Sequence, residues 1–254
     1  MMDLLEIRQV TKVFGGLTAL NEVSFHVKSG NIHGLIGPNG AGKSTMFKNI
    51  SGFSTPTSGD IFFNGHSIKG RKPSEIAHLG VVRTFQETTL FQELTVLENA
   101  LVGAHKRAKT NIFSAIFNLD RHIQQECMEK ALSMLDFMGL AERKNQLASE
   151  LPLGSQRALA ITIALASKPV VLLMDEPFAG MNPEETRHMM GLTEKVRQSG
   201  VTIVLVEHDM KAVMGICDYL TVLNFGSLLA EGTPDAIRHD AKVIRAYLGN
   251  TEAM

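Results

Sequence analysis

A glycine-rich segment near the N-terminus has the residue types and spacing needed to bind a phosphate group. Residues 37–45 read Gly-Pro-Asn-Gly-Ala-Gly-Lys-Ser-Thr, which fits the pattern G-x-x-x-x-G-K-[ST] without a mismatch. Glycines let such a loop curl so that several backbone N–H groups point at one anion, and the start of the following helix adds positive charge. The residues expected to surround the phosphate are Gly37, Pro38, Asn39, Gly40, Ala41 and Gly42.

Three side chains at the end of this segment have separate expected roles toward a nucleoside triphosphate. Lys43 would reach the β- and γ-phosphates, and the hydroxyl of Ser44 would ligate Mg²⁺. Thr45 is placed to contact the α-phosphate. The loop alone predicts phosphate binding and leaves open what the phosphate energy drives.

Two carboxylates follow a continuous apolar run at 171–174. If that run is a strand beside the loop strand, Asp175 would reach the Mg²⁺ shell, directly or through water. Glu176 would then face the attacking water as a general base. The alternative is a strand that simply ends in two solvated carboxylates. Next to a phosphate loop, we favour the catalytic interpretation.

His208 and Gln86 are polar residues whose roles are less restricted by their spacing. His208 follows the next buried strand, so it would lie at the same sheet edge and could bond the γ-phosphate or position the water. A lone histidine is more often structural, and that alternative stays open. Gln86 would contact Mg²⁺ or the water, or it is simply a polar loop residue.

The hydrophobic pattern predicts the elements that position these residues. Strands with one exposed face are expected at 5–10 and 23–27, where apolar and polar residues alternate. A continuous apolar run at 170–174 is typical of a strand that is covered on both faces. A second buried strand is expected at 201–206, and the short apolar run at 32–36 is expected to end at Gly37. Further predicted elements are a helix at 43–50, a strand at 61–65, a helix opened by Asn182-Pro183, a hairpin at 220–230 and a final helix at 233–248. Alternation of strands and helices predicts an α/β fold with a largely parallel sheet.

The middle of the chain has a different pattern. A capping box at Thr95–Glu98 starts one predicted helix, which reaches about residue 108. Apolar residues at helical spacing between Ile123 and Met138 predict another, with Gly139 as its end. We therefore expect a mostly helical insertion at about 92–165.

Composition excludes several classes of protein. The chain has 254 residues, 44% of them hydrophobic and 20% charged, with a formal net charge of −1. These values are typical of a globular protein, and they provide no overall field that attracts nucleic acid or anionic lipid. The sequence has no basic segment followed by an apolar stretch at its start, and no uncharged apolar run of ~18 residues. A soluble, cytoplasmic protein is expected, with Cys127 and Cys217 as reduced thiols in the core.

Taken in order, five features resemble the ATP-binding subunit of ABC transporters over essentially the whole chain. They are the phosphate loop, Gln86, the segment 151–157 (Leu-Pro-Leu-Gly-Ser-Gln-Arg), Asp175-Glu176 and His208. The resemblance implies ATP and Mg²⁺ as cofactors. It also implies an α/β P-loop NTPase core with a mostly parallel sheet, an antiparallel β subdomain and an inserted helical subdomain. The expected organisation is one ATPase domain over 1–254, with the core at 1–91 and 166–254 and the helical subdomain at about 92–165.

The family also implies roles for individual residues. Phe14 matches the aromatic that stacks on adenine, Gln86 the glutamine that senses the γ-phosphate and faces the membrane partner, and His208 the switch histidine. Segments 14–17, 83–86, 179–183 and 243–249 further resemble the branched-chain amino acid importer group, in particular the larger of its two paired ATPase subunits. Members of that group also serve urea, amides and aromatic acids.

The resemblance implies specific partners. They are a second ATPase subunit that sandwiches ATP in a homo- or heterodimer, two membrane permease subunits, and a periplasmic or extracellular solute-binding protein. The chain would lie on the cytoplasmic side of the cell membrane as a peripheral protein, and no nucleic acid is expected. Nothing in the chain itself indicates the transported solute.

One motif departs from the family pattern. The usual signature is Leu-Ser-Gly-Gly-Gln, but here Pro152 stands where the serine belongs and Leu153 where the first glycine belongs. Proline offers neither a hydroxyl nor an N–H group. Gly154 is kept, Ser155 would replace part of the lost contact, and a helix at 158–166 would point its N-terminus at phosphate. We expect this chain to have a competent phosphate loop and to lend a weak signature to its partner.

Three alternatives remain open from the sequence. The chain could serve another ABC system, such as a lipopolysaccharide-type exporter. It could be a soluble DNA-repair or translation ATPase, although it has neither a long coiled coil before the signature nor a second such domain. It could also be a module that binds nucleotide without hydrolysing it, against which Glu176 and His208 argue.

Overall fold

The protein was analysed as a computed structural model, which describes residues 3–84, 90–105 and 121–248. The chain divides into two compact units. The first unit comprises Met1–Arg83, Val170–Ala179 and Thr193–Met254, and the second comprises Thr84–Pro169 and Gly180–Leu192.

Two sheets form the framework of the first unit. The antiparallel sheet has the order β2-β1-β4-β5 and is built from β1 (Asp3–Phe14), β2 (Leu17–Lys28), β4 (Ser58–Phe63) and β5 (His66–Ser67). The second sheet has the order β10-β9-β3-β8-β7-β6 and is parallel apart from β10. Its strands are β3 (Ile32–Ile36), β6 (Val81–Arg83), β7 (Val171–Asp175), β8 (Thr202–Val206), β9 (Tyr219–Asn224) and β10 (Ser227–Gly232).

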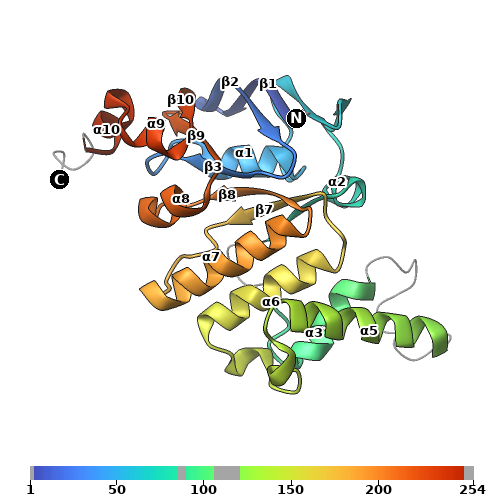
Figure 1. Cartoon of the computed structure of the whole chain (residues 1–254). Helices are drawn as coiled ribbons and strands as arrows, with labels where there is room; N and C mark the ends of the chain where they lie inside the picture. The colour runs from blue at the N-terminus through green and yellow to red at the C-terminus, as the bar shows by residue number, and fades with distance from the viewer. Residues whose placement is uncertain (1–2, 85–89, 106–120, 249–254) are drawn as a thin grey trace. The chain divides into compact units, whose positions relative to one another are not determined.

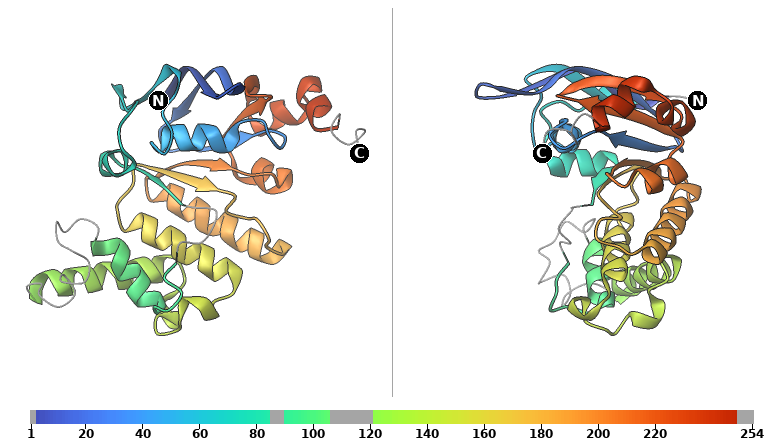
Figure 2. Two further views of the ribbon diagram at one scale, coloured as in Figure 1. Left: turned by 180° about the vertical axis from the view of Figure 1, so that it is seen from behind. Right: turned by 90° about the vertical axis from the view of Figure 1, so that its left-hand side faces the viewer.

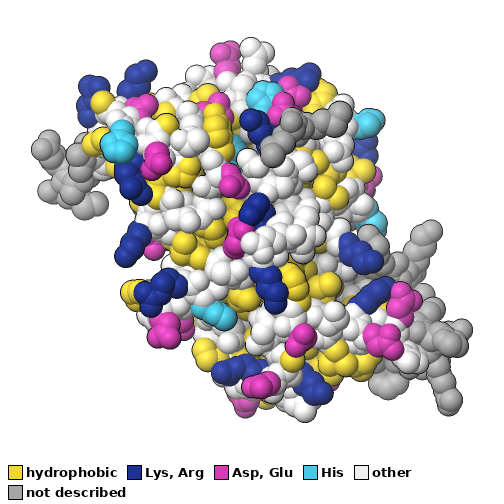
Figure 3. All heavy atoms as spheres, viewed as in Figure 1, with side chains coloured by type: hydrophobic (Ala, Val, Ile, Leu, Met, Phe, Trp, Pro, Cys, Tyr) yellow, Lys and Arg dark blue, Asp and Glu magenta, His cyan; other side chains and the backbone are white. Residues whose placement is uncertain are grey.

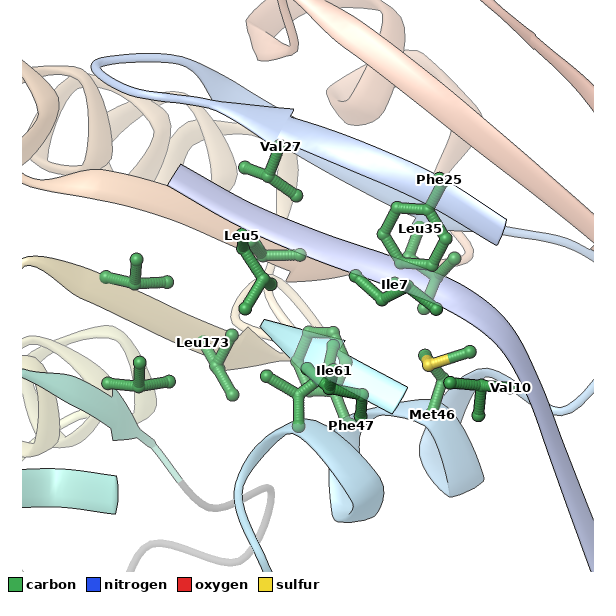
Figure 4. Close-up of a cluster of buried hydrophobic side chains, with 14 of the residues drawn as sticks. Leu5, Ile7, Val10, Phe25, Val27, Leu35, Met46, Phe47, Ile61 and Leu173 are labelled. Atoms are coloured by element: carbon green, nitrogen blue, oxygen red, sulfur yellow. The ribbon is translucent and has the colours of Figure 1, made fainter. Parts of the chain in front are cut away.

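Helix α1 (Lys43–Ile50) lies between these two sheets, as both Figure 1 and Figure 2 show. Its apolar side chains join those of β1, β2 and β4 on one side and of β3 and β7 on the other (Figure 4). Phe25, Phe47 and Leu173 are each almost completely buried in this cluster. Burying side chains of this size stabilises the fold by about 1.5–3 kcal/mol each. The core therefore holds the start of α1 against the end of β3.

The remaining helices of the first unit are short. They are α2 (Pro73–Leu79), α8 (Met210–Ile216), α9 (Pro234–Arg238) and α10 (Ala241–Leu248). The prediction of one final helix over 233–248 is wrong, because α9 and α10 are separate. The carboxylate of Asp240 accepts hydrogen bonds from the N–H groups of Lys242 and Val243, so it caps the start of a new helix.

Helices dominate the second unit. They are α3 (Val96–His105), α5 (Arg121–Phe137), α6 (Leu153–Leu165) and the first part of α7 (Pro183–Gln198), with 3-10 turns at Ala141–Arg143 and Ala148–Glu150. The predicted capping box is confirmed, since Thr95 and Glu98 each bond the other's backbone N–H. A Cβ on Gly103 would lie 2.8 Å from the carbonyl oxygen of Ile163. Helices α3 and α6 therefore approach too closely for any side chain at that position.

The structure confirms the predicted fold class, an α/β P-loop core with a mostly parallel sheet, an antiparallel β part and helices in the middle of the chain. Cys217 is buried as expected, whereas Cys127 is only partly buried on α5. Basic and acidic side chains are intermingled on the face that Figure 3 shows, consistent with the near-zero net charge. Within the described ranges, no helix is long and apolar enough to cross a bilayer.

Candidate nucleotide-binding site

The phosphate loop connects the buried strand β3 to α1 and depends on glycine geometry. Gly37, Gly40 and Gly42 have φ values of 148°, 79° and 102°, in the region that favours glycine. A Cβ on Gly37 would lie 2.1 Å from the carbonyl oxygen of Leu223. Only glycine allows β3 to turn sharply at this point, beside the end of β9.

The start of α1 is open toward the loop. Its N-cap is Gly42, which has no side chain to accept hydrogen bonds from the first-turn N–H groups. Such groups, together with the helix dipole, form an anion site. Lys43 is 9% exposed, and its Nζ donates to the carbonyl oxygens of Gly37 at 2.6 Å and Pro38 at 3.0 Å. The ammonium group is therefore held directly over the loop.

Opposing effects act on the charge of Lys43. Burial lowers its pKa, while the nearby carboxylates of Glu176 and Asp175 act to raise it. The two acids that follow β7 are thus close enough to influence the lysine of the loop electrostatically. The structure brings together these three residues, which lie far apart in the sequence.

A cavity of about 440 Å³ opens over the loop, which is within the usual size range for small-molecule sites. Its walls come from the first residues of β2, the phosphate loop, Glu176 and the turn between β9 and β10. The lining residues are Leu17, Thr18, Ala19, Asn39, Gly40, Ala41, Gly42, Lys43, Ser44, Thr45, Glu176, Phe225 and Gly226.

The aromatic residue that lines this cavity is Phe225, whereas Phe14 was the aromatic expected near the nucleotide. Phe14 is half exposed at the end of β1, with Lys12 Nζ 4.9 Å from its ring centre, and it is not part of the cavity lining. Leu17, its partner in the β1–β2 register, does line the cavity. Phe225 also lines it and is 83% exposed. In the sequence Phe225 reads only as part of a hairpin turn, so its position beside the loop was missed.

Asp175 ends β7 and is almost completely buried. Its Oδ2 accepts a hydrogen bond of 2.5 Å from Nη2 of Arg83, at the end of the neighbouring strand β6. The two side chains are 4% and 10% exposed, respectively, so they form a buried ion pair. The guanidinium carbon of Arg83 also lies 5.9 Å from the ring centre of Phe47 on α1. Sequence reasoning did not identify Arg83 as the partner of Asp175.

The order of the strands also differs from the simplest expectation. Strand β8 lies between β3 and β7, so the strand next to the loop strand leads to His208 and not to Asp175. Strands β7 and β8 are both mainly apolar in the sequence. The sequence therefore does not indicate which of them lies next to β3. Because all three strands are parallel, their carboxyl ends still meet at one edge of the sheet.

Glu176 and His208 face each other at that edge. Oε1 of Glu176 is 3.8 Å from Nδ1 of His208, and their side chains are 27% and 60% exposed. Glu176 has φ +48°, which is uncommon for a non-glycine residue and typical of functional sites. A partly exposed carboxylate and imidazole at the rim of a phosphate site can accept a proton and orient water.

Glu207 bonds the backbone near both of these residues and was not identified from the sequence. It is 1% exposed. Its Oε1 accepts the N–H of Phe178 at 2.7 Å, and its Oε2 accepts the N–H of His208 at 3.0 Å. Burial raises the pKa of the Glu207 carboxyl, and the backbone hydrogen bonds partly offset that rise. The available signal was an acidic residue at the end of an apolar strand, the same pattern that singled out Asp175 and Glu176.

The oxygen ligands at this edge are suited to Mg²⁺. Ser44 is exposed in the first turn of α1 and Asp175 ends β7. Magnesium sites in nucleotide-binding proteins use one or two protein oxygens, with phosphates and water as the other ligands. The described residues contain no group of three or more His, Cys, Asp or Glu that could hold a metal by themselves. Gln86, the other expected ligand, lies outside the described residues.

The signature segment belongs to the second unit. Helix α6 begins at Leu153, with Pro152 as its N-cap, so the predicted start at 158 is wrong. The run from Leu153 to Leu165 contains no proline, its one glycine lies in the first turn, and Pro152 suits a helix start. Gly154 and Ser155 therefore lie in the first turn. They help to line a hollow of about 280 Å³ together with Pro152, Asn182, Glu184, Glu185, His188 and Met189.

The sequence of this chain is similar to those of known proteins. The model of the ABC transporter family matches residues 20–179, and that of the branched-chain amino acid ATP-binding cassette transporter matches residues 227–253. The high-affinity branched-chain amino acid transport ATP-binding protein LivG of Escherichia coli (strain K12) is 45% identical, over 97% of this chain and 98% of the relative. The corresponding protein BraF of Pseudomonas aeruginosa is 44% identical, with the same coverage.

Solved structures agree with this assignment. A nucleotide-free ATP-binding cassette from an ABC transporter is 32% identical and superposes with a TM-score of 0.86, over 97% of this chain and 99% of that chain. A dimeric ATP-binding cassette in a post-hydrolysis state, bound to ADP and Pi, is 25% identical with a TM-score of 0.76, over 91% and 99%. The chain therefore belongs to the ABC transporter family, as one of its ATP-binding and ATP-hydrolysing subunits.

Proposed function

We propose that this chain hydrolyses ATP with Mg²⁺ to energise an importer of branched-chain amino acids or related small polar solutes. The observation that carries the hydrolytic role is the 3.8 Å approach of Glu176 to His208, with Glu176 lining the cavity over the phosphate loop. The substrate class is supported by the full-length similarity to LivG and BraF, whose names describe branched-chain amino acid transport.

Each side chain has a role that follows from its position. The loop N–H groups and Lys43 bind the phosphates, while Ser44 and Asp175 hold Mg²⁺, which neutralises phosphate charge when bound. Glu176 accepts a proton from the attacking water, and His208 orients that water or bonds the γ-phosphate. Thr45 contacts the α-phosphate.

Further proposed contacts lie at the periphery of the nucleotide. Phe14 would stack on adenine, and Gln86 would sense the γ-phosphate. Gly154 and Ser155 would face a nucleotide held by a second subunit. We propose that the helices of the second unit form the signature-bearing subdomain of a single ATPase domain.

The proposed assembly contains a second ATPase subunit, two permease subunits and a solute-binding protein, with this chain at the cytoplasmic face of the membrane. The dimeric cassette bound to ADP and Pi supports pairing of two ATPase subunits. The finding that no described helix could span a bilayer is compatible with a peripheral subunit.

The catalytic role is tested by the variant Glu176→Gln. The amide cannot take a proton, so we expect hydrolysis to fall by about 10²- to 10⁴-fold while ATP binding is retained. Phosphate release measures the first quantity, and the affinity for a fluorescent ATP analogue measures the second. Unchanged hydrolysis would remove Glu176 from the base role.

The transport role is tested by co-expressing the chain with the permease and binding-protein genes that neighbour its own. Uptake of radiolabelled leucine into vesicles should depend on ATP and on Lys43. An ATPase rate that does not respond to the permeases and binding protein would argue against an importer. Uptake of another small solute in place of leucine would correct the substrate and keep the rest of the proposal.

A further inference from the structure

Glu207 is an unusual residue to find at the end of a buried strand. A carboxylate that is 1% exposed is costly to bury unless charges or hydrogen bonds compensate for lost water. Its hydrogen bonds come from backbone N–H groups, and the imidazole of His208 lies beside it, with Nδ1 3.9 Å from Oε2. Such a costly arrangement indicates a specific role.

The backbone around Glu176 indicates what that role is. Glu176 has φ +48°, a conformation that costs about 1–3 kcal/mol and persists only where the surroundings hold it. Two bonds from the end of β8 do so. The N–H of Glu176 donates to the carbonyl of Val206 at 2.9 Å, and the N–H of Phe178 donates to Oε1 of Glu207 at 2.7 Å. The backbone at Glu176 and two residues later is therefore held by Val206, the last residue of β8, and by Glu207, which follows it.

The other carboxylate oxygen fixes the histidine. Oε2 of Glu207 accepts the N–H of His208 at 3.0 Å and lies 3.5 Å from the N–H of Asp209. One side chain thus bonds the backbone on the C-terminal side of Glu176 and the backbone of His208 itself. The distance between Oε1 of Glu176 and Nδ1 of His208 depends on these bonds, because the two loops come from different strands.

We propose that Glu207 is a positioning residue for ATP hydrolysis, which holds the loop after Glu176 and the loop at His208 in one fixed relation. The inference rests on the proposed roles of Glu176 and His208. Glu207 is not one of the residues that line the cavity. Its loss should therefore affect the catalytic step and leave the phosphate loop unchanged.

The variant Glu207→Gln tests this proposal. An amide has only one accepting atom, so its NH₂ group must face a backbone N–H that needs an acceptor. A displacement of about 1 Å in catalytic groups can cost 10²-fold in rate. We expect kcat to fall by about 10- to 100-fold, with KM and the affinity for ATP within twofold of the wild type. Hydrogen exchange at Phe178 and His208 should become faster.

Asp218→Asn provides a matched control. Asp218 also accepts a backbone N–H from a distant strand, that of Ile32 at 2.8 Å, but it lies at the opposite end of β3 from the phosphate loop. This variant should keep its kcat. A second variant, Glu207→Asp, keeps the charge but is one methylene too short to bond both loops, and it should behave as Glu207→Gln does. If Glu207→Gln does not fold, the kcat of Glu207→Asp tests the positioning role.

Phosphate release by the full-length chain, alone and with its membrane partners, provides the readout. The proposal is overturned if both Glu207 variants hydrolyse ATP as fast as Asp218→Asn, or if ATP affinity falls as much as kcat. These outcomes differ from those expected if Glu176 is not the general base. If Glu176→Gln retains activity, the base role fails; if only the Glu207 variants retain it, the positioning role fails.

Discussion

Replacing Arg83 by methionine should destabilise the nucleotide-free protein through one buried charge. Asp175 is 4% exposed and Arg83 is 10% exposed, with 2.5 Å between Nη2 and Oδ2. Removing one partner of a buried pair typically costs 3–5 kcal/mol, because the other charge remains uncompensated. Domains are commonly stable by only 5–15 kcal/mol, so the loss should be large. Methionine keeps an apolar stem of similar length but removes the guanidinium group, whose carbon lies 5.9 Å from the ring centre of Phe47.

A double-mutant cycle separates the ion pair from the other contacts of Arg83. Urea unfolding, followed by circular dichroism in the presence of EDTA, gives the free energy of unfolding of the wild type, Arg83→Met, Asp175→Asn and the double variant. In the Asp175→Asn background the arginine has no carboxylate to neutralise. Its loss should then cost about 1 kcal/mol or less, which gives a coupling energy of about 2–4 kcal/mol.

Magnesium and nucleotide provide a second readout for the same pair. Mg²⁺ bound near Asp175 would supply the positive charge that Arg83 supplies in its absence. MgADP should therefore stabilise Arg83→Met more than it stabilises the wild type, beyond the effect of ADP in EDTA. An equal cost of Arg83→Met in both Asp175 backgrounds, together with equal stabilisation by MgADP, would refute the reasoning.

Two further predictions concern His33 and Pro152. Burial lowers the pKa of His33 from 6.5 to about 4. Stability is therefore unaffected by this histidine above pH 6.5. As the pH falls from 6.5 toward 4, the unfolded chain binds a proton that the folded chain does not, and the free energy of unfolding falls by about 3 kcal/mol. Urea unfolding at pH 7.5 and pH 4.5 should show a smaller acid loss for His33→Gln, and equal losses would contradict the assignment. Pro152→Ser would place a hydroxyl and an N–H at the start of α6. One restored charge-assisted hydrogen bond of ~1.4 kcal/mol to the phosphate held by the partner subunit should raise the turnover of the assembled complex by about tenfold. Unchanged turnover would reject the hypothesis that this chain provides a weak signature.

Most elements that carry the site follow from local patterns. The phosphate loop, the helix at 43–50 and the strands before Asp175 and His208 lie where the sequence predicts them, because glycine spacing and continuous apolar runs act over a few residues. The errors have local causes as well. A side-chain cap at Asp240 divides the final helix, and a helix start at Pro152 brings Gly154 and Ser155 into the first turn of α6.

Contacts between distant segments were not predictable in this way. Arg83 and Asp175 are 92 positions apart, and the bond from Phe178 to Glu207 spans 29 positions. In each pair, the sequence around one residue contains no pattern that identifies the other residue as its partner. The order of β3, β8 and β7 is equally hidden, because all three are short buried strands and nothing in their residues indicates which of them lie side by side.

The sequence by itself predicted a phosphate site at residues 37–45 and identified the acids and the histidine that could act near it. A glycine loop followed by a helix is a local structure, and its chemistry follows from residue type. Only the tertiary structure decided which groups meet. It paired Arg83 with Asp175 and placed Glu207 between the loops of Glu176 and His208. The physical reason is that buried charges acquire their partners from strand order, which results from packing of the whole core.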